Sequence, residues 1–121
     1  MNPAELFRHD SGALSLAPGD FLFRENEPGD KMYVLLEGEM EVLLGNLVVE
    51  KAAPGALLGE MALIDSSPRT ASVVAKTPCR LAEIDLRRFH FLVQQTPNFA
   101  THVMKVLSAR LRRMNAMAAA S

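Results

Sequence analysis

One segment of the sequence combines residue types that could hold an anion joined to a sugar. It covers residues 58–73, with Gly59-Glu60 near its start and Pro68-Arg69 near its end. A short helix that begins after Gly59 would present backbone N–H groups without helical partners, and glycine leaves room for close approach. The Arg69 guanidinium can hold two phosphate oxygens at once, and an ionised Glu60 can accept from a hydroxyl. The segment therefore predicts a site for a singly charged phosphodiester fused to a ribose.

Other anion sites fit this segment less well. Arg69 is its only cation, and no Gly-x-x-x-x-Gly-Lys loop occurs, so a triphosphate is a poor match. Glu60 or Arg69 alone could equally be one half of a surface ion pair, which would stabilise the protein little. The prediction depends on finding both residues in one segment.

Residues that could support catalysis or bind a metal are scattered. His9, His90 and His102 lie far apart and form no metal-ligand pattern. No histidine is placed to activate Ser66 or Ser67 as a nucleophile. We therefore expect no enzyme activity, no catalytic residue, no metal and no cofactor.

The composition is that of one folded domain. The chain has 121 residues, of which 49% are hydrophobic and 22% charged, enough for a single core. No apolar run exceeds five residues, and the first thirty residues contain six acidic residues, so neither a membrane span nor a signal peptide is expected. The single cysteine, Cys79, can form no internal disulfide and should pack as a small hydrophobe. These features predict a reducing, cytoplasmic location.

Charge is distributed unevenly along the chain. Residues 1–85 carry seven basic and fourteen acidic residues, whereas residues 86–121 carry six basic and no acidic residues. A basic segment can bind nucleic acid. Because no DNA-reading motif accompanies it, we interpret these arginines as the solvent face of a helix.

The first 85 residues read as strands. Turn-forming residues divide them into pieces of mostly about 6 to 10 residues, a spacing typical of an antiparallel sandwich or barrel. Within the pieces apolar residues alternate, as at Met40, Val42 and Leu44. Residues 2–7 favour one short helix before them. We expect a mainly β fold, a small antiparallel β-roll with flanking helices.

Helical spacing replaces the strand pattern after this region. Asp85 is the expected N-cap of a first helix, and Thr96 the N-cap of a second that begins at Pro97. The second helix has an apolar stripe from Phe99 to Met117 without a helix breaker. It would span roughly 30 Å, longer than a small roll needs for cover.

The segment that carries the predicted anion site resembles the phosphate-binding cassette of cyclic nucleotide-binding domains. Gly-Glu-Met-Ala-Leu at 59–63 and Pro-Arg-Thr-Ala at 68–71 carry the resemblance, which extends from about residue 10 to about residue 115. Further matching motifs are Pro-Gly-Asp at 18–20, Glu-Pro-Gly-Asp-Lys-Met-Tyr at 27–33 and Glu-Gly at 37–38.

The resemblance implies the family fold. This is an antiparallel β-roll or jelly-roll of about eight strands with a short N-terminal helix, a cassette helix and two C-terminal helices. The chain is then one domain, 1–121, made of an N-terminal helix (1–10), the roll (11–85) with its cassette (58–73), and the C-terminal helices (86–119).

The resemblance also implies roles for single residues. Arg69 would pair with the cyclic phosphate, and Glu60 would accept from the ribose 2′-hydroxyl. Val42 and Val49 are expected to pack near the purine. The backbone N–H groups expected to complete the anion site are those around Gly59, Met61, Ala62, Thr70 and Ala71.

The last helix is expected to close over the base. Its candidate base contacts are Arg112, Met114, Asn115 and Met117. The apolar stripe alone already accounts for the two methionines as core or dimer-interface residues.

The implied function is a regulatory module that binds a 3′,5′-cyclic nucleotide and signals through movement of its C-terminal helix. We expect cAMP first, with cGMP as the alternative, and an unidentified protein partner. The rival is the effector domain of a transcription regulator or channel, similar to that of the catabolite activator protein, without its output domain in this chain. Direct DNA binding is therefore not expected. The pattern favours a stand-alone domain of a bacterial type, and the helix stripe could pair two chains as a homodimer.

Overall fold

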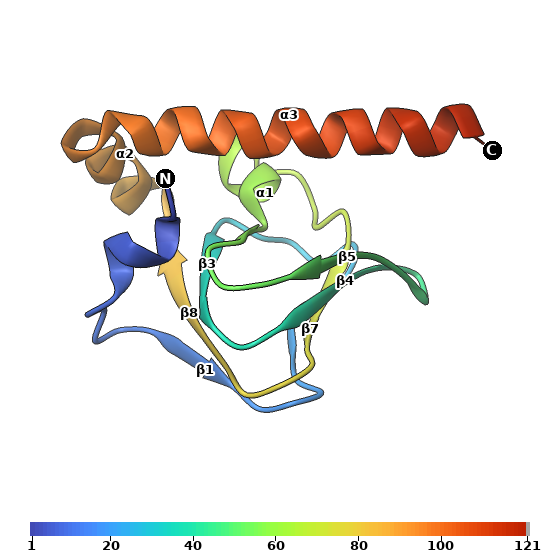
Figure 1. Cartoon of the computed structure of the whole chain (residues 1–121), viewed down its shortest axis with the longest axis horizontal. Coiled ribbons are helices and arrows are strands. Elements are labelled where there is room, and N and C mark those ends of the chain that lie inside the picture. The colour runs from blue at the N-terminus through green and yellow to red at the C-terminus, as the bar shows by residue number, and fades with distance from the viewer. Residues whose placement is uncertain (121) are drawn as a thin grey trace.

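The structure is a computed structural model that describes residues 1–120, and Ser121, the last residue of the predicted domain, lies outside the described residues. Within residues 1–120, eight strands form two four-stranded antiparallel sheets (Figure 1). This confirms the predicted β-roll. The strands are β1 (Leu14–Leu16), β2 (Phe21–Phe23), β3 (Met32–Glu37), β4 (Met40–Leu44), β5 (Leu47–Ala52), β6 (Leu57–Leu58), β7 (Ser72–Ala75) and β8 (Cys79–Ile84).

The two sheets have the strand orders β1-β8-β3-β6 and β2-β7-β4-β5. The register of β4 and β5 shifts next to Val42. Val42 pairs with Glu50, and the following residue, Leu43, pairs with Val48, so that Val49 lies at the irregularity. Because directly paired residues point to the same face of a sheet, the bulge places Glu50 beside Val42.

Helices flank the roll at the predicted places. They are the 3-10 helix η1 (Pro3–Phe7), α1 (Glu60–Asp65), α2 (Leu86–Gln95) and α3 (Pro97–Ala120). The N-terminal helix is one tight turn, capped by the Asn2 side chain, which accepts from the Ala4 N–H at 3.1 Å. In Figure 1, α3 lies along the roll and α1 lies between them.

The cap of α2 and the first residue of α3 lie where the sequence predicts them. Asp85 accepts from the Arg88 N–H at 2.8 Å and so caps α2. Thr96 separates the helices through its backbone, since its N–H donates to the Leu92 carbonyl at 2.7 Å and its carbonyl accepts from Phe99 at 2.9 Å. Pro97 is the first residue of α3, as predicted.

The core consists of two groups of buried side chains. One lies between the β1-β8-β3-β6 sheet and the helices and includes Phe99 and Val103 of α3. The Phe99 ring meets Phe89 of α2 edge to face at 5.9 Å between centroids. The other group fills the roll and includes Cys79, which is buried as predicted.

Only the first half of the α3 stripe is used by this core. Leu111, Met114 and Met117 expose 59%, 61% and 49% of their surface, and the C-terminal part of α3 extends past the roll (Figure 1). Among residues 1–120, no helix is long and apolar enough to cross a membrane.

Candidate functional site

The cassette helix α1 begins at a backbone conformation that suits glycine. Gly59 has φ +75°, in the left-handed region, and its carbonyl end leads into the six residues of α1. No side chain caps this end of α1. The first N–H groups of the helix therefore lack a side-chain acceptor.

Arg69 is a buried cation that forms no ion pair with the residues that the structure describes. It is 6% exposed, and its Cζ lies 4.1 Å from the centroid of the Phe23 ring. Its Nη1 donates to the Gly59 carbonyl at 3.1 Å, but its buried Nε has no hydrogen-bond partner. A buried charge of this kind is costly unless something compensates it.

The surroundings of Arg69 modify its pKa accordingly. Burial lowers the pKa of the guanidinium, and this effect is only partly opposed by the phenol of Tyr33, which is charged only when ionised at high pH, and by the carboxylates of Asp30, Glu27 and Glu60. Burial raises the pKa of Tyr33 despite the nearby arginine, so the phenol stays neutral and does not act as a counter-ion. An anion that enters the site would supply the missing negative charge.

Two glycines and two backbone hydrogen bonds hold Arg69 in place. A Cβ atom at either Gly29 or Gly59 would overlap the guanidinium, so both positions leave the slot open for it. The Arg69 N–H donates to the Glu27 carbonyl at 2.8 Å, and the Arg69 carbonyl accepts from Asn26 at 2.8 Å. Gly29 lies in a motif that carries the family resemblance but is not among the predicted site residues. The feature of the sequence that points to it is a glycine within a Glu-Pro-Gly-Asp turn.

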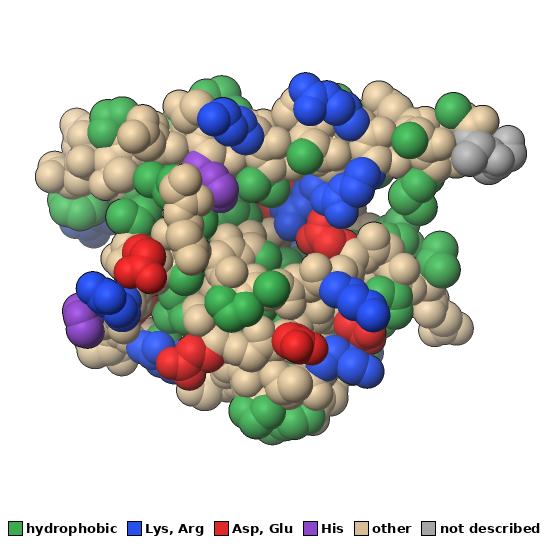
Figure 2. All heavy atoms as spheres, in the orientation of Figure 1, with side chains coloured by type: hydrophobic (Ala, Val, Ile, Leu, Met, Phe, Trp, Pro, Cys, Tyr) green, Lys and Arg blue, Asp and Glu red, His purple; other side chains and the backbone are tan. Residues whose placement is uncertain are grey.

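Glu60, the predicted ribose acceptor, is buried and ion-paired to α3. It is 3% exposed, and its Oε1 accepts a short hydrogen bond from Arg110 Nη1. Arg110 also donates to Glu50 Oε2 at 2.9 Å and to the Leu57 carbonyl at 2.5 Å. Glu50 Oε1 accepts in addition from Arg113 at 2.6 Å. Figure 2 shows basic side chains meeting an acidic one between α3 and the roll.

This cluster was missed by the sequence analysis, which placed the C-terminal arginines on a solvent face. That interpretation is wrong for Arg110, whose side chain is 22% exposed. The spacing of Arg110 in the sequence indicates that it faces the roll. Arg110 follows Val106 by four residues and Val103 by seven, and so lies on the same helix face as the stripe that packs on the roll.

The other predicted phosphate contacts lie at the two ends of the cassette. The Arg69–Gly59 hydrogen bond joins these ends. Ala62 is buried, and the side chain of Met61 points to solvent. Thr70 is exposed and precedes β7, which begins at Ser72.

The structure does not bring the predicted base contacts together in one place. Val42 packs against the core of the roll, and Val49 is half-buried at the β-bulge. The four C-terminal candidates are all exposed, and the ion pairs from α3 to the roll come from Arg110 and Arg113 instead. These exposed candidates are Arg112, Met114, Asn115 and Met117.

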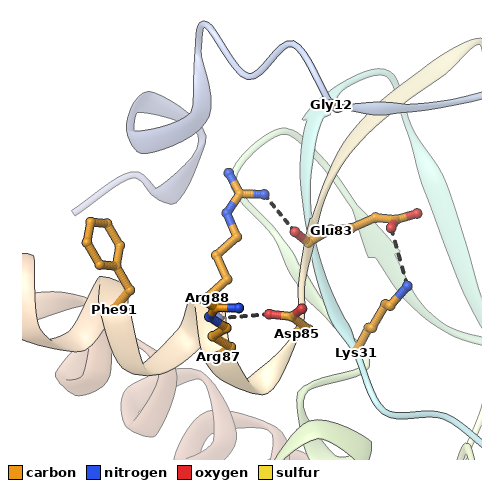
Figure 3. A pocket seen from close by; sticks show the side chains of 7 residues that line it. All are labelled: Gly12, Lys31, Glu83, Asp85, Arg87, Arg88 and Phe91. Atoms are coloured by element: carbon orange, nitrogen blue, oxygen red, sulfur yellow. Dashed lines mark hydrogen bonds and ion pairs between the residues drawn. The ribbon is translucent and has the colours of Figure 1, made fainter.

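A separate hollow of about 510 Å³ is lined by no residue of the cassette (Figure 3). Three of its charged side chains already have partners, since Lys31 pairs with Glu83 at 3.6 Å and Arg88 donates to the Glu83 carbonyl at 2.7 Å and pairs with Asp10 at 3.3 Å. The hollow is lined by Gly12, Lys31, Glu83, Asp85, Arg87, Arg88 and Phe91.

Within residues 1–120, no group of three or more His, Cys, Asp or Glu side chains could hold a metal.

Comparison with known proteins decides which family has this roll and cassette. Residues 13–96 match the sequence profile described as "Cyclic nucleotide-binding domain". The chain belongs to this family. A cyclic nucleotide-binding domain is a regulatory binding module and not a catalytic one.

Similar proteins include a cyclic nucleotide-gated potassium channel of Mesorhizobium japonicum, 38% identical over 88 residues. That alignment covers 73% of this chain but only 24% of the channel. A cyclic nucleotide-binding domain from Methylobacillus flagellatus is 30% identical, with a TM-score of 0.70 over 83% of this chain and 61% of the other. The catabolite activator protein of Thermus thermophilus shares the fold, with a TM-score of 0.76 at 24% sequence identity. The superposition covers 91% of this chain and 59% of the Thermus protein.

Proposed function

We propose that this cyclic nucleotide-binding domain holds its ligand in the cassette, with Arg69 on the cyclic phosphate and Glu60 on the ribose 2′-hydroxyl. The observation that supports this most strongly is Arg69 itself. It is 6% exposed, lacks an ion-pair partner among the described residues, and has a buried Nε that donates to nothing. A phosphodiester would supply both the charge and the acceptor.

The charge of the site fits a single negative charge. Arg69 is the only basic residue of the cassette, and the uncapped start of α1 adds backbone donors around Gly59. A 3′,5′-cyclic phosphate carries one negative charge, whereas an open 5′-monophosphate carries nearly two. The site should therefore prefer the cyclic ester to the open one.

The ribose contact follows from the chemistry of Glu60. An ionised carboxylate only accepts hydrogen bonds, and Arg110 occupies Oε1. The second oxygen, Oε2, can accept from a hydroxyl without displacing Arg110. We therefore infer that the domain distinguishes a ribonucleotide from its 2′-deoxy analogue.

The nucleotide and the output complete the proposal. We take cAMP as the first ligand and cGMP as the alternative, with a location in the cytoplasm. The last helix, α3, would move with ligand and pass the signal to a partner, because Arg110 joins it directly to Glu60. The similar channel carries such a module within a longer protein, so an effector domain of a channel or transcription regulator is the second candidate.

Calorimetric titration with cAMP, cGMP, 2′-deoxy-cAMP and 5′-AMP tests the proposal. We expect one site per chain, the tightest binding for a cyclic ribonucleotide, and weaker binding for the 2′-deoxy and open-phosphate analogues. The absence of heat with both cAMP and cGMP would overturn the proposed function. Sedimentation with and without ligand would test whether the exposed stripe of α3 pairs two chains.

A further inference from the structure

Glu50 on β5 is held by two arginines of α3 at once. Its Oε2 accepts from Arg110 Nη2 at 2.9 Å, and its Oε1 accepts from Arg113 Nη2 at 2.6 Å and from Arg110 Nε at 3.3 Å. Arg110 and Arg113 are three residues apart and so project from the same side of the helix. The sheet therefore contributes one carboxylate that reaches two successive positions on α3.

Arg110 is enclosed by acceptors from three elements of the roll. Glu50 comes from β5, the Leu57 carbonyl from β6 and Glu60 from α1. Burial alone would lower the pKa of Arg110, but the charges and hydrogen bonds of Glu60 and Glu50 outweigh it and raise the pKa. The guanidinium stays charged and its position is defined by several elements at once.

These contacts matter because α3 has little else beneath its second half. Val103 is buried, and Val106 and Leu107 pack on the core, but residues 111–119 are all exposed. Among residues 97–119 of α3, Arg110 is thus the last whose side chain is partly buried. Charge contacts replace apolar contacts at this point of the helix.

The two carboxylates differ in what else they do. Glu60 is the proposed acceptor for the ribose hydroxyl, so its carboxylate would bind both Arg110 and the ligand. Glu50 has no part in the proposed ligand contacts, and its carboxylate oxygens are both occupied by α3. Its hold on the helix is present without ligand.

We propose that Glu50 is a positioning residue that fastens the second half of α3 over the cassette through Arg110 and Arg113 in the ligand-free protein. The effect on ligand exchange rests on the proposed function. If α3 covers the bound nucleotide through the same contacts, release requires them to break. Glu50 would then set the lifetime of the complex without touching the ligand.

The first test uses the ligand-free chain and the variant Glu50→Gln. We expect hydrogen exchange of the α3 amides from residue 108 to residue 117 to become about tenfold faster, because opening of this segment costs less. Glu41→Gln is the matched control, since Glu41 lies on β4 and pairs at 3.7 Å with Lys76, which lies outside α3. Unchanged exchange in Glu50→Gln, or an equal change in Glu41→Gln, would overturn the proposal.

The second test measures release of a fluorescent cAMP analogue after mixing with excess cAMP. We expect Glu50→Gln to speed dissociation about tenfold and to speed association as well, because the same contacts would have to open for the ligand to leave and to enter. Added salt should speed release from the wild type more than from the variant, because salt screens the partly exposed pairs. Equal rates and equal salt dependence would overturn the proposal.

The variant Arg113→Gln guards against a simple loss of folding. Arg113 is 54% exposed and its ion pair is with Glu50, so the variant should fold normally and show a smaller effect. Combined with Glu50→Gln it should add nothing, because both changes remove the same contact. Additive effects would contradict a shared contact. If no cyclic nucleotide bound at all, the proposed function would fail, while the exchange experiment would still decide the role of Glu50.

Discussion

Arg110 on α3 pairs with Glu60, the first residue of α1, across a separation of 50 positions in the chain. The last helix of the domain therefore contacts the proposed ribose acceptor directly. A ligand that engages Glu60 changes the surroundings of the residue that fastens α3. This contact gives the proposed movement of the helix a specific starting point.

Replacement of the cassette arginine should abolish nucleotide binding. Arg69→Leu removes a charge-assisted contact to a desolvated phosphate, a loss of about 2 to 5 kcal/mol in binding free energy. The fold should survive, because Arg69 is tied to Asn26 and Glu27 by backbone atoms only. Calorimetric titration measures the binding, and circular dichroism the fold.

Arg24→Leu is the matched control for this variant. Arg24 also lies over a phenylalanine, with its Cζ 3.8 Å from the Phe21 centroid, but it stands outside the cassette. Its replacement should leave the affinity unchanged. Unchanged affinity in Arg69→Leu itself would remove the cassette assignment.

A methyl group at Gly29 should weaken phosphate binding indirectly, through its effect on Arg69. The added Cβ would overlap the Arg69 guanidinium, which must then leave its slot. We expect Gly29→Ala to weaken cAMP binding by at least tenfold, about 1.4 kcal/mol, as measured by titration.

Gly12→Ala provides the comparison. A Cβ at Gly12 would meet its nearest neighbour, Asp10, at 3.6 Å, which is ordinary contact. This variant should bind like the wild type. If Gly29→Ala also bound like the wild type, the guanidinium would not need its observed position.

The ribose contact can be isolated by a cycle of two changes. Glu60→Gln replaces the acceptor-only carboxylate, and 2′-deoxy-cAMP lacks the hydroxyl that it would accept from. We expect the preference of the wild type for cAMP over the 2′-deoxy analogue to shrink in the variant by about 1.5 to 3 kcal/mol. The variant also weakens the contact with Arg110, but this loss affects both ligands alike and cancels in the ratio of their affinities. An undiminished preference would place the ribose elsewhere.

Acid should weaken the attachment of α3 through Glu50. Burial alone would raise the pKa of Glu50, but hydrogen bonds and charges from Arg110 and Arg113 outweigh it, so the pKa lies below its ordinary value of 4.5. The unfolded chain then binds this proton more readily than the folded one. The stabilising contribution is complete above the ordinary pKa and is lost as pH falls through the lowered one.

Urea unfolding measures this dependence. The free energy of unfolding should decline as the pH falls below about 5, and less steeply in Glu50→Gln. The prediction concerns the difference between the two proteins, because they share every other carboxylate. Identical acid slopes would show that Glu50 contributes nothing.

Thr70 should influence the choice between nucleotides. Its hydroxyl can accept a hydrogen bond from the 2-amino group of a syn guanine, a group that adenine lacks. We expect Thr70→Ala to weaken cGMP several-fold, about 1 kcal/mol, and to leave cAMP nearly unchanged in parallel titrations. The exposure of Thr70 ahead of β7 leaves this hydroxyl accessible. A parallel loss for both nucleotides, or no loss, would remove Thr70 from the selectivity argument.

Much of this domain was predictable because its cues are local. Turn residues and alternating apolar residues define the strands, Asp85 caps α2, and Pro97 starts α3. The predicted anion site also depends on local cues, because its residues lie in one short segment. Position 59 has a left-handed backbone conformation that favours glycine, and Arg69 follows within ten residues.

The cluster around Arg110 could be recognised only in the tertiary structure. Glu50 reaches α3 because a bulge beside Val49 turns it to the face of Val42, and such a register shift depends on how two strands pair. The rotation of α3 depends in turn on the packing of Phe99 and Val103 into the core. Long-range packing sets both, so a basic segment that resembles a solvent face in the sequence becomes the attachment of a helix to its site.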